Sequence, residues 1–369
     1  MDAPDALLTL CLEQVRRYPL MQVTDLFKLA YQHVFGGGHL VTNEQESLER
    51  LRQEVQASAA SHTPDLSHSI TSTDADRFEP IGNDLYRLHL NGIENTGIEI
   101  TTVNRFFIRT AEEITGTVDQ FRETIGILRE WILSGSSPFS LHEFDGLLLD
   151  YDFDTCPPFS HSPAFRSEYA PAYRIVHARY RDYFPIFCRI DSLLRSRSSL
   201  TIAIDGYCGS GKSTLAERLQ RIYDCPVIPM DHFFLPPALR TEERLAEIGG
   251  NVDYDRFTRE VGSGLKDGQP FTYRVYDCAT KTMGQTVSIR PAKLVVVEGS
   301  YSLHPRLADA YDLKIFLDID PREQMRRIRA RNPGLVERFQ NEWIPKENQY
   351  FQTMRIAEKS DLVLRPLKD

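Results

Sequence analysis

The sequence predicts an α/β protein with two domains, of which the C-terminal one is a parallel sheet covered by helices on both faces. After residue 200, short continuous apolar runs alternate with helical patterns, as is typical of parallel strands buried on both sides. Before residue 195, helical periodicity predominates over a few short strand signals, which indicates a mainly helical α+β domain. A chain of 369 residues is long enough for two such cores.

The N-terminal segment is predicted to begin with three helices. Apolar residues recur at helical spacing over 7–15 and again over 26–35. Asn43 is placed to cap a third helix that runs toward residue 55, because its short amide side chain can accept a hydrogen bond from the first helical turn. The stretch 58–76 is rich in Ser, Thr, His and Asp, which predicts a surface loop.

Strands and further helices are expected between residues 85 and 195. The alternation over 85–90 predicts one strand, and the run Arg105–Ile108 is a candidate for a second. Helices are predicted over 118–133 and, as one long element, from about 171 to 195.

The segment 195–199, Arg-Ser-Arg-Ser-Ser, is the best linker candidate. We therefore expect a domain over 1–195, whose sequence indicates no function, and a second domain over 200–369. The histidines of the first domain, including His33, His39 and His161, lack metal-ligand spacing, so structural roles are expected for them.

Composition excludes several classes of protein. Hydrophobic residues make up 41% and charged residues 26%, the profile of a globular protein. No apolar run approaches the ~18 residues of a membrane span, and no basic residue precedes the first apolar run, so we expect a cytoplasmic protein without membrane contact. The net charge of −9 argues against a general nucleic-acid binder, and the six scattered cysteines indicate neither disulfides nor a zinc site.

Five apolar runs are predicted to form the C-terminal sheet. They are 200–204, 225–230, 293–297, 313–317 and 361–364.

A phosphate-binding motif follows the first of these runs. Gly206-Tyr207-Cys208-Gly209-Ser210-Gly211-Lys212-Ser213 fits GxxxxGK[ST], and Thr214 follows it. Glycines let successive backbone N–H groups face a phosphate, and the next helix points its positive end at the same anion. Lys212 supplies a charge to the β- and γ-phosphate oxygens, and the Ser213 hydroxyl can ligate Mg²⁺. A chance match in a Gly-rich loop is the alternative, but the strand before the motif and the helix after it favour a nucleoside triphosphate site.

Two carboxylates follow predicted strands, where ligands of such sheets bind. Asp231 comes after the run that ends at Met230, and Glu298 after the run that ends at Val297. Asp231 is placed to accept the proton of an acceptor hydroxyl, and Glu298 to contact Mg²⁺. Each could instead only cap a following helix.

Five arginines are concentrated between residues 322 and 331. Phosphoryl transfer needs cations for the charge that it moves, and Arg327 and Arg331 are four apart on one helical face. A solvated basic face is the alternative.

The order of these motifs resembles the uridine kinase and phosphoribulokinase family of P-loop kinases. The resemblance covers about residues 200–369 and rests on the phosphate loop, Asp-His-Phe-Phe at 231–234, Asn-Val-Asp at 251–253, Tyr276-Asp277, Glu298-Gly299 and the arginine-rich segment. It implies a doubly wound sheet and a kinase that uses ATP and Mg²⁺ to phosphorylate a small hydroxyl compound.

The resemblance also implies roles for individual residues. Asp231 matches the catalytic base, Arg327 and Arg331 match lid arginines, Asp253 matches a residue that holds the acceptor sugar, and Tyr276 matches a residue of the acceptor pocket. Lys281 stands where uridine-cytidine kinases have a pyrimidine-reading histidine. A charged lysine cannot accept a hydrogen bond, so this position departs from the family pattern.

The acceptor expected first is a nucleoside such as uridine. Pantothenate, a ribosyl pyridine and a regulatory switch that only binds nucleotide remain alternatives, and the sequence leaves homo-oligomerisation open.

Overall fold

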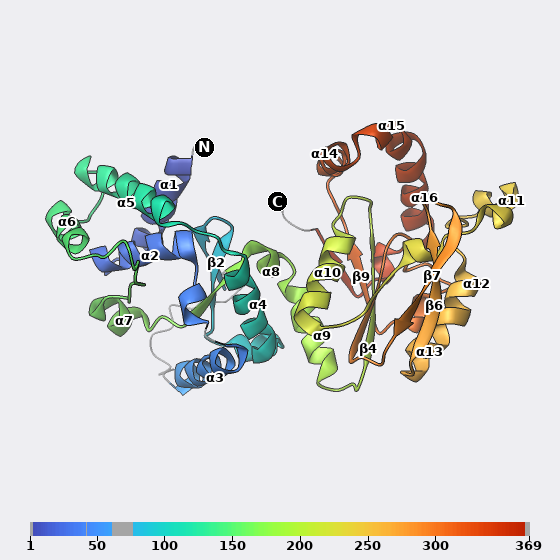
Figure 1. Ribbon diagram of the computed structural model, residues 1–369, viewed down its shortest axis with the longest axis horizontal. Helices are drawn as coiled ribbons and strands as arrows, with labels where there is room; N and C mark the ends of the chain where they lie inside the picture. The colour runs from blue at the N-terminus through green and yellow to red at the C-terminus, as the bar shows by residue number, and fades with distance from the viewer. Residues whose placement is uncertain (1–2, 42, 61–76, 366–369) are drawn as a thin grey trace. The chain divides into compact units, whose positions relative to one another are not determined.

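The computed structural model describes residues 3–41, 43–60 and 77–365. Contacts divide the chain into two compact units, Met1–Phe184 and Pro185–Asp369, which are described separately (Figure 1). The loop predicted over 58–76 lies outside the described residues from residue 61 onward.

The N-terminal unit combines helices with one small sheet. Strands β1, β2 and β3 form this sheet in that order, and both pairs are antiparallel. The strands are β1 Phe78–Gly82, β2 Leu85–His89 and β3 Tyr173–His177. The helices are α1 Ala3–Arg17, α2 Val23–Phe35, α3 Glu44–Ala60, α4 Ile100–Glu113, α5 Val118–Leu133, α6 Leu141–Leu149, α7 Pro163–Tyr169 and α8 Ala178–Asp182, with short 3₁₀ turns at Gly38–Leu40 and Ile93–Thr96.

Several sequence predictions for this unit are confirmed. The helix over 118–133 is α5, the strand over 85–90 is β2, and the Asn43 side chain caps α3 by accepting a hydrogen bond from the Glu46 N–H at 2.9 Å.

Two predictions for this unit are wrong. The strand candidate Arg105–Ile108 lies inside α4, whose buried residues Val103, Phe106, Phe107 and Thr110 follow helical spacing. The four-residue run was too short to distinguish a strand from the buried face of a helix.

The long helix predicted over 171–195 is in fact β3, α8 and α9 (Phe184–Leu194). Tyr173–His177 pairs with β2, residue by residue, from His89↔Tyr173 to Leu85↔His177. Pairing with β2 therefore overrides the helical spacing of the aromatic residues, which tertiary contacts commonly do.

The C-terminal unit is built on a five-stranded parallel sheet. The strands are β4 Leu200–Gly206, β5 Val227–Pro229, β8 Leu294–Glu298, β9 Leu313–Leu317 and β10 Leu362–Leu364. The helices are α10 Lys212–Tyr223, α11 Glu242–Ala246, α12 Tyr254–Phe257, α13 Ser263–Asp267, α14 Pro321–Arg331, α15 Val336–Arg338 and α16 Ile344–Met354. An antiparallel hairpin of β6 Phe271–Asp277 and β7 Thr282–Ile289 stands apart from the sheet. Short 3₁₀ or π-helical turns lie at Met230–Phe233, Pro237–Leu239, Thr258–Gly262, Ala308–Ala310, Pro333–Leu335, Phe339–Trp343 and Ala357–Lys359.

The order of strands in the sheet is β10-β9-β4-β8-β5, and every neighbouring pair is parallel. The chain starts at the centre, fills one side with β5 and β8, and then fills the other with β9 and β10. Right-handed crossovers in such a sheet place helices on both faces, so the fold is doubly wound as predicted. The direction of winding changes beside β4, and ligands of these folds bind at that point.

The five predicted strands of this unit all occur. Figure 1 shows α14 and α15 beyond one end of the sheet, with α16 leading back toward it. Among the described helices of the whole chain, none is both long and apolar enough to cross a membrane.

Candidate active site

The phosphate loop leaves the sheet at the end of its central strand. All seven residues of β4 are buried, and β4 lies between β8 and β9. Gly206 ends the strand with φ +145°, and a Cβ there would come within 2.2 Å of the Leu317 carbonyl oxygen. Gly209 and Gly211 also have positive φ, +78° and +99°. Glycine is therefore required at these turns, because other residues adopt such angles only with strain.

Lys212 opens α10 and spans the loop. Its Nζ donates hydrogen bonds to the carbonyl oxygens of Gly206 at 2.7 Å and Tyr207 at 3.0 Å. The ammonium group and the first N–H groups of a twelve-residue helix thus meet at one place. This is the electrostatic arrangement that binds a phosphate. The Ser210 Oγ in the same loop is buried without a hydrogen-bond partner among the described residues, which leaves one polar atom for a ligand.

Ser213 and Glu298 form the part of the site that suits a magnesium ion. The Ser213 Oγ donates to Glu298 Oε2 at 3.3 Å. Glu298 ends β8 and is only 8% exposed, and burial raises the pKa of its carboxyl, with the charge of Asp231 adding to the rise. Hydroxyl and carboxylate oxygens are ligands that Mg²⁺ prefers.

Asp231 lies next to this pair because of the sheet register. Pro229 of β5 pairs with Glu298, and Asp231 follows two residues later in a 3₁₀ turn. The carboxyl is open to the water of the pocket, yet enough protein surrounds it that desolvation raises its pKa, while Lys212, His232 and Arg331 oppose the rise. A group with these neighbours can accept a proton beside a phosphate.

Helix α14 contacts the loop from outside the sheet. The Gln324 Nε2 donates to the Cys208 carbonyl at 3.0 Å, and the Arg327 Nη1 reaches the Gly209 carbonyl at 3.4 Å. Arg331, one turn later, is exposed, and its charge acts on Asp231. The two predicted lid arginines therefore have different surroundings: Arg327 lies at the phosphate loop and Arg331 within electrostatic range of the carboxylate.

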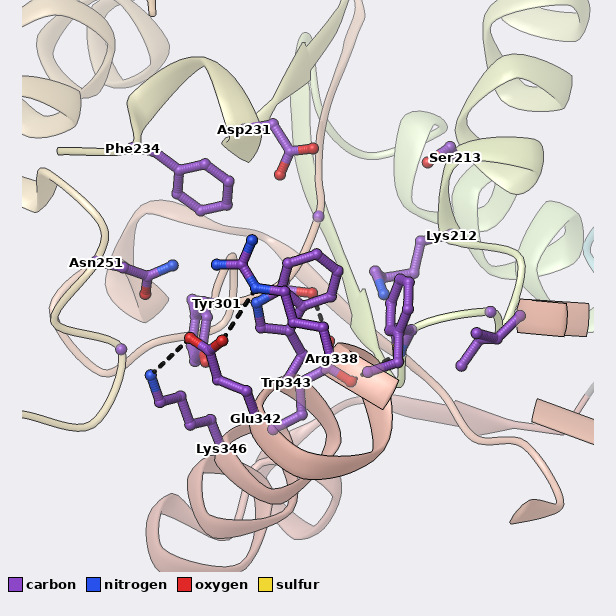
Figure 2. A pocket seen from close by; sticks show the side chains of 18 of the residues that line it. Lys212, Ser213, Asp231, Phe234, Asn251, Tyr301, Arg338, Glu342, Trp343 and Lys346 are labelled. Carbon is purple, nitrogen blue, oxygen red and sulfur yellow. Dashed lines mark hydrogen bonds and ion pairs between the residues drawn. The ribbon is translucent and has the colours of Figure 1, made fainter. Parts of the chain in front are cut away.

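These elements enclose a pocket of about 1180 Å³. The loop and the start of α10, including Ser213 and Thr214, form one wall. Figure 2 shows Phe234 and Asn251 on the opposite side, with Asp231 between them and the loop. The residues between α14 and α16 form a third wall, where Glu342 binds both Arg338 at 3.0 Å and Lys346 at 3.3 Å.

The sequence of this unit matches that of known kinases. Residues 201–329 match the model of the phosphoribulokinase/uridine kinase family, a stretch that holds the loop, both carboxylates and Arg327. The C-terminal unit is therefore similar to the phosphoribulokinase/uridine kinase family, and the match supports a kinase of this type.

Two sequence relatives and one solved structure are similar to this unit. A uridine kinase from Clostridium perfringens is 28% identical over 175 residues, 42% of this chain and 84% of that protein. A uridine kinase from Clostridium botulinum (strain Kyoto) is 31% identical over 130 residues, 32% of this chain and 62% of that protein. The solved structure "Possible Uridine Kinase from Bacillus stearothermophilus" is 22% identical, with a TM-score of 0.38, and covers 48% of this chain and 97% of its own.

The three residues that the sequence predicts to bind an acceptor do not line the pocket. Asp253 caps α12 by accepting from the Arg256 N–H at 3.0 Å. Tyr276 is buried, and its hydroxyl accepts from Arg240 Nη2 at 3.1 Å. Lys281 lies on the exposed turn of the β6–β7 hairpin with φ +59°. Their roles toward an acceptor stay predictions.

Sequence reasoning missed two carboxylates that hold the loop. Asp205, fully buried before Gly206, accepts from the N–H groups of Gly206 and Leu303 at 2.8 and 3.1 Å and from the Tyr350 hydroxyl at 2.9 Å. Burial raises the pKa of Asp205 to about 6. A lone aspartate in an apolar strand was the only signal.

Glu347, also buried, accepts from the Cys208 N–H and the Ser300 hydroxyl, both at 2.9 Å. It lies on α16, 139 residues after Cys208. No local pattern in the sequence could connect it to the loop.

Proposed function

We propose that the C-terminal unit transfers the γ-phosphoryl group of ATP to a hydroxyl group of a small metabolite. The observation that carries the proposal is a carboxylate, Asp231, in the same pocket as the phosphate loop, within electrostatic range of Lys212. A protein that only binds nucleotide needs the loop but has no need of a proton acceptor beside it.

The residues of the pocket fit the groups that this reaction requires. Backbone N–H groups of the loop and Lys212 suit the β- and γ-phosphates. Ser213 and Glu298 would hold Mg²⁺, which supplies positive charge to the phosphate oxygens when it is bound. The arginines of α14 would stabilise the negative charge that develops during transfer.

In the proposed transfer, Asp231 acts as the base. The acceptor oxygen forms a bond to the γ-phosphorus as the bond from that phosphorus to the β–γ bridging oxygen breaks, and ADP leaves. The proton of the acceptor hydroxyl passes to Asp231. A raised pKa makes this carboxylate a better proton acceptor than an ordinary aspartate, provided that it stays ionised at the working pH.

A nucleoside, with uridine first, is the acceptor that the relatives' names favour. A hydroxyl compound with a carboxylate, such as pantothenate, is a second candidate. The observation that favours it is Arg240, which lines the pocket away from the phosphate loop.

The test is ATP consumption by the full chain with Mg²⁺ and a panel of nucleosides, pantothenate and ribosyl pyridines. We expect one class of acceptor to stimulate ADP formation in the wild type, and Asp231→Asn to lose that stimulation. If no acceptor of a broad panel stimulates turnover while ATP still binds, the unit is a nucleotide-binding switch and the proposed reaction is wrong.

A further inference from the structure

The cations of the pocket differ in whether a carboxylate neutralises them. Arg326 and Arg327 share Glu323, and Arg338 and Lys346 share Glu342. Three lining cations form no ion pair with a carboxylate of the described residues: Lys212, Arg240 and Arg331. An uncompensated cation in a concave site is a candidate for binding an anion.

Two of these three cations are expected to bind the phosphates of the nucleotide. Lys212 lies on the phosphate loop, and Arg331 follows Arg327 on the helix that contacts this loop. Arg240 is on the other side of the pocket. Its Nε donates to the Leu235 carbonyl at 2.7 Å, and the Leu235 N–H donates to the Asn251 carbonyl. Arg240 therefore belongs to the same wall as Phe234 and Asn251, which Figure 2 labels.

The guanidinium of Arg240 is held in place with one edge open. Its contacts with described residues use the Nε–H and one Nη2–H, which donates to the Tyr276 hydroxyl, and the group lies 5.8 Å from the centre of the Tyr276 ring. Both N–H groups of Nη1 and the second of Nη2 make no hydrogen bond to the described residues. This pair of nitrogens is the edge that binds a carboxylate or phosphate through two parallel hydrogen bonds.

A nearby arginine, Arg244, differs from Arg240 in that it has a carboxylate partner. Arg244, four residues later, forms an ion pair with Glu247 and donates to the Val252 carbonyl at 3.0 Å. Arg244 is thus paired with a carboxylate, whereas Arg240 forms no such ion pair within the described part of the chain.

Arg240 is also close to the proton acceptor. The Cys278 Sγ contacts the Asp231 carbonyl oxygen at 3.8 Å. Burial raises the pKa of this thiol, the charge of Asp231 adds to the rise, and the charge of Arg240 opposes it. Arg240 and Asp231 also line the same pocket, so one acceptor can contact both side chains.

We infer that the acceptor carries an anionic group, a carboxylate or a phosphate, that binds the open edge of Arg240 while its hydroxyl lies at Asp231. The inference rests on the proposed phosphoryl transfer and narrows its acceptor. Tyr276, predicted to contact the acceptor, then acts as a positioning residue that holds the guanidinium. A neutral nucleoside would leave this cation without an ion pair to the described residues or to the acceptor.

The experiment uses the full chain with Mg²⁺ and γ-¹⁸O-labelled ATP in a cell extract of small molecules, with labelled products identified by mass spectrometry. We expect a product with an anionic group besides the new phosphate. We expect Arg240→Gln to raise the KM for that acceptor at least tenfold with the KM for ATP unchanged, and Arg240→Lys to recover only part of the loss. Arg290→Gln, an exposed arginine outside the pocket, is the control.

Matched compounds then separate the charge from the rest of the acceptor. Uridine against orotidine, and panthenol against pantothenate, differ by one carboxylate, while ribulose against ribulose 5-phosphate tests a phosphate. We expect the charged member of at least one pair to have the higher kcat/KM in the wild type and to lose this advantage in Arg240→Gln.

The possible results separate two failures. A product that is neutral apart from its new phosphate, or an advantage of charge that survives in Arg240→Gln, would overturn the anionic acceptor and leave the kinase proposal standing. Absence of any labelled product would overturn the proposed reaction and the inference with it. If Arg240→Gln has a much lower melting temperature than the wild type, the matched pairs are compared in the wild type alone. In that case, a kcat/KM for the charged compound that is equal to or lower than that for the neutral compound in every pair would overturn the inference.

Discussion

The two sides of the pocket are built from different parts of the chain. The donor side uses backbone N–H groups and side chains such as Lys212 and Ser213 from one contiguous segment, 206–214, at the end of β4. The proposed acceptor side uses side chains from separate loops, among them Phe234, Arg240 and Asn251. A site made of backbone needs the same few residue types whatever its ligand, whereas a site made of side chains changes with the ligand. The comparison predicts that donor-side changes abolish the reaction and acceptor-side changes redirect it.

The largest effect is expected on the donor side, for Lys212→Ala. Removing the ammonium takes a charge from the β- and γ-phosphates, so kcat/KM should fall by about 10³-fold or more for every acceptor alike. Steady-state kinetics measure this, with Lys266→Ala, an exposed lysine on α13, as the control. A loss that differs between acceptors would show that the two sides are not separate.

Asp231→Asn lies where the two sides meet, and its effect should be smaller. Without a proton acceptor, kcat should fall by about 10²–10³-fold while the affinity for ATP is retained. Protonation of Asp231 should make the wild-type kcat fall as the pH is lowered. Because the pKa of Asp231 is raised, this fall should begin at a higher pH than it would for an ordinary aspartate. Asp255→Asn, an exposed aspartate outside the pocket, should leave the pH profile unchanged. An unaltered kcat in Asp231→Asn would remove this residue as the base.

A third test concerns what holds the donor side in shape. The folded-state pKa of Asp205 is about 6, above its ordinary value, so the folded chain binds this proton more tightly than the unfolded chain. The contribution of Asp205 to stability is therefore present at low pH and is lost as the pH rises from about 4 to about 6. Relative to Asp205→Asn, the wild type should lose about 2 kcal/mol of unfolding free energy across this range. Urea unfolding of both proteins at a series of pH values measures the difference, and a difference that is constant with pH would refute it.

The smallest effect is expected on the acceptor side, for Lys281→Ala. The side chain is exposed on the hairpin turn and does not line the pocket, so the KM for the acceptor should change by less than about twofold, as surface changes usually do. Kinetics with the identified acceptor measure this. A tenfold rise in KM would mean that the hairpin folds over the bound acceptor, and it would restore the role predicted from the sequence.

The sequence was informative wherever function depends on local order. The central strand, the loop and the first turn of α10 are contiguous, so their residue types alone predict them. Asp231 and Glu298 could be paired because carboxyl ends of parallel strands meet at one edge of a sheet.

The sequence was misleading or uninformative where a contact with a distant part of the chain determines the local structure or the role of a residue. Tyr173–His177 is a strand because β2 lies beside it, and Arg105–Ile108 is helical because its buried neighbours extend the pattern in both directions. Arg240 stands out because it forms no ion pair with a carboxylate of the described residues, and a sequence cannot show that a contact is missing. Glu347 reaches a loop 139 residues earlier.

The contact between Glu347 and Cys208 has a consequence for the order in which the protein is made. A ribosome that has added residue 340 has already synthesised the whole phosphate loop, but not the carboxylate that binds its Cys208 N–H or the Tyr350 hydroxyl that binds Asp205. Domains generally fold as units, so the loop gains these contacts only after α16 has been synthesised. The nucleotide site is thus among the last parts of this unit to be completed during translation, although its motif is among the first to appear.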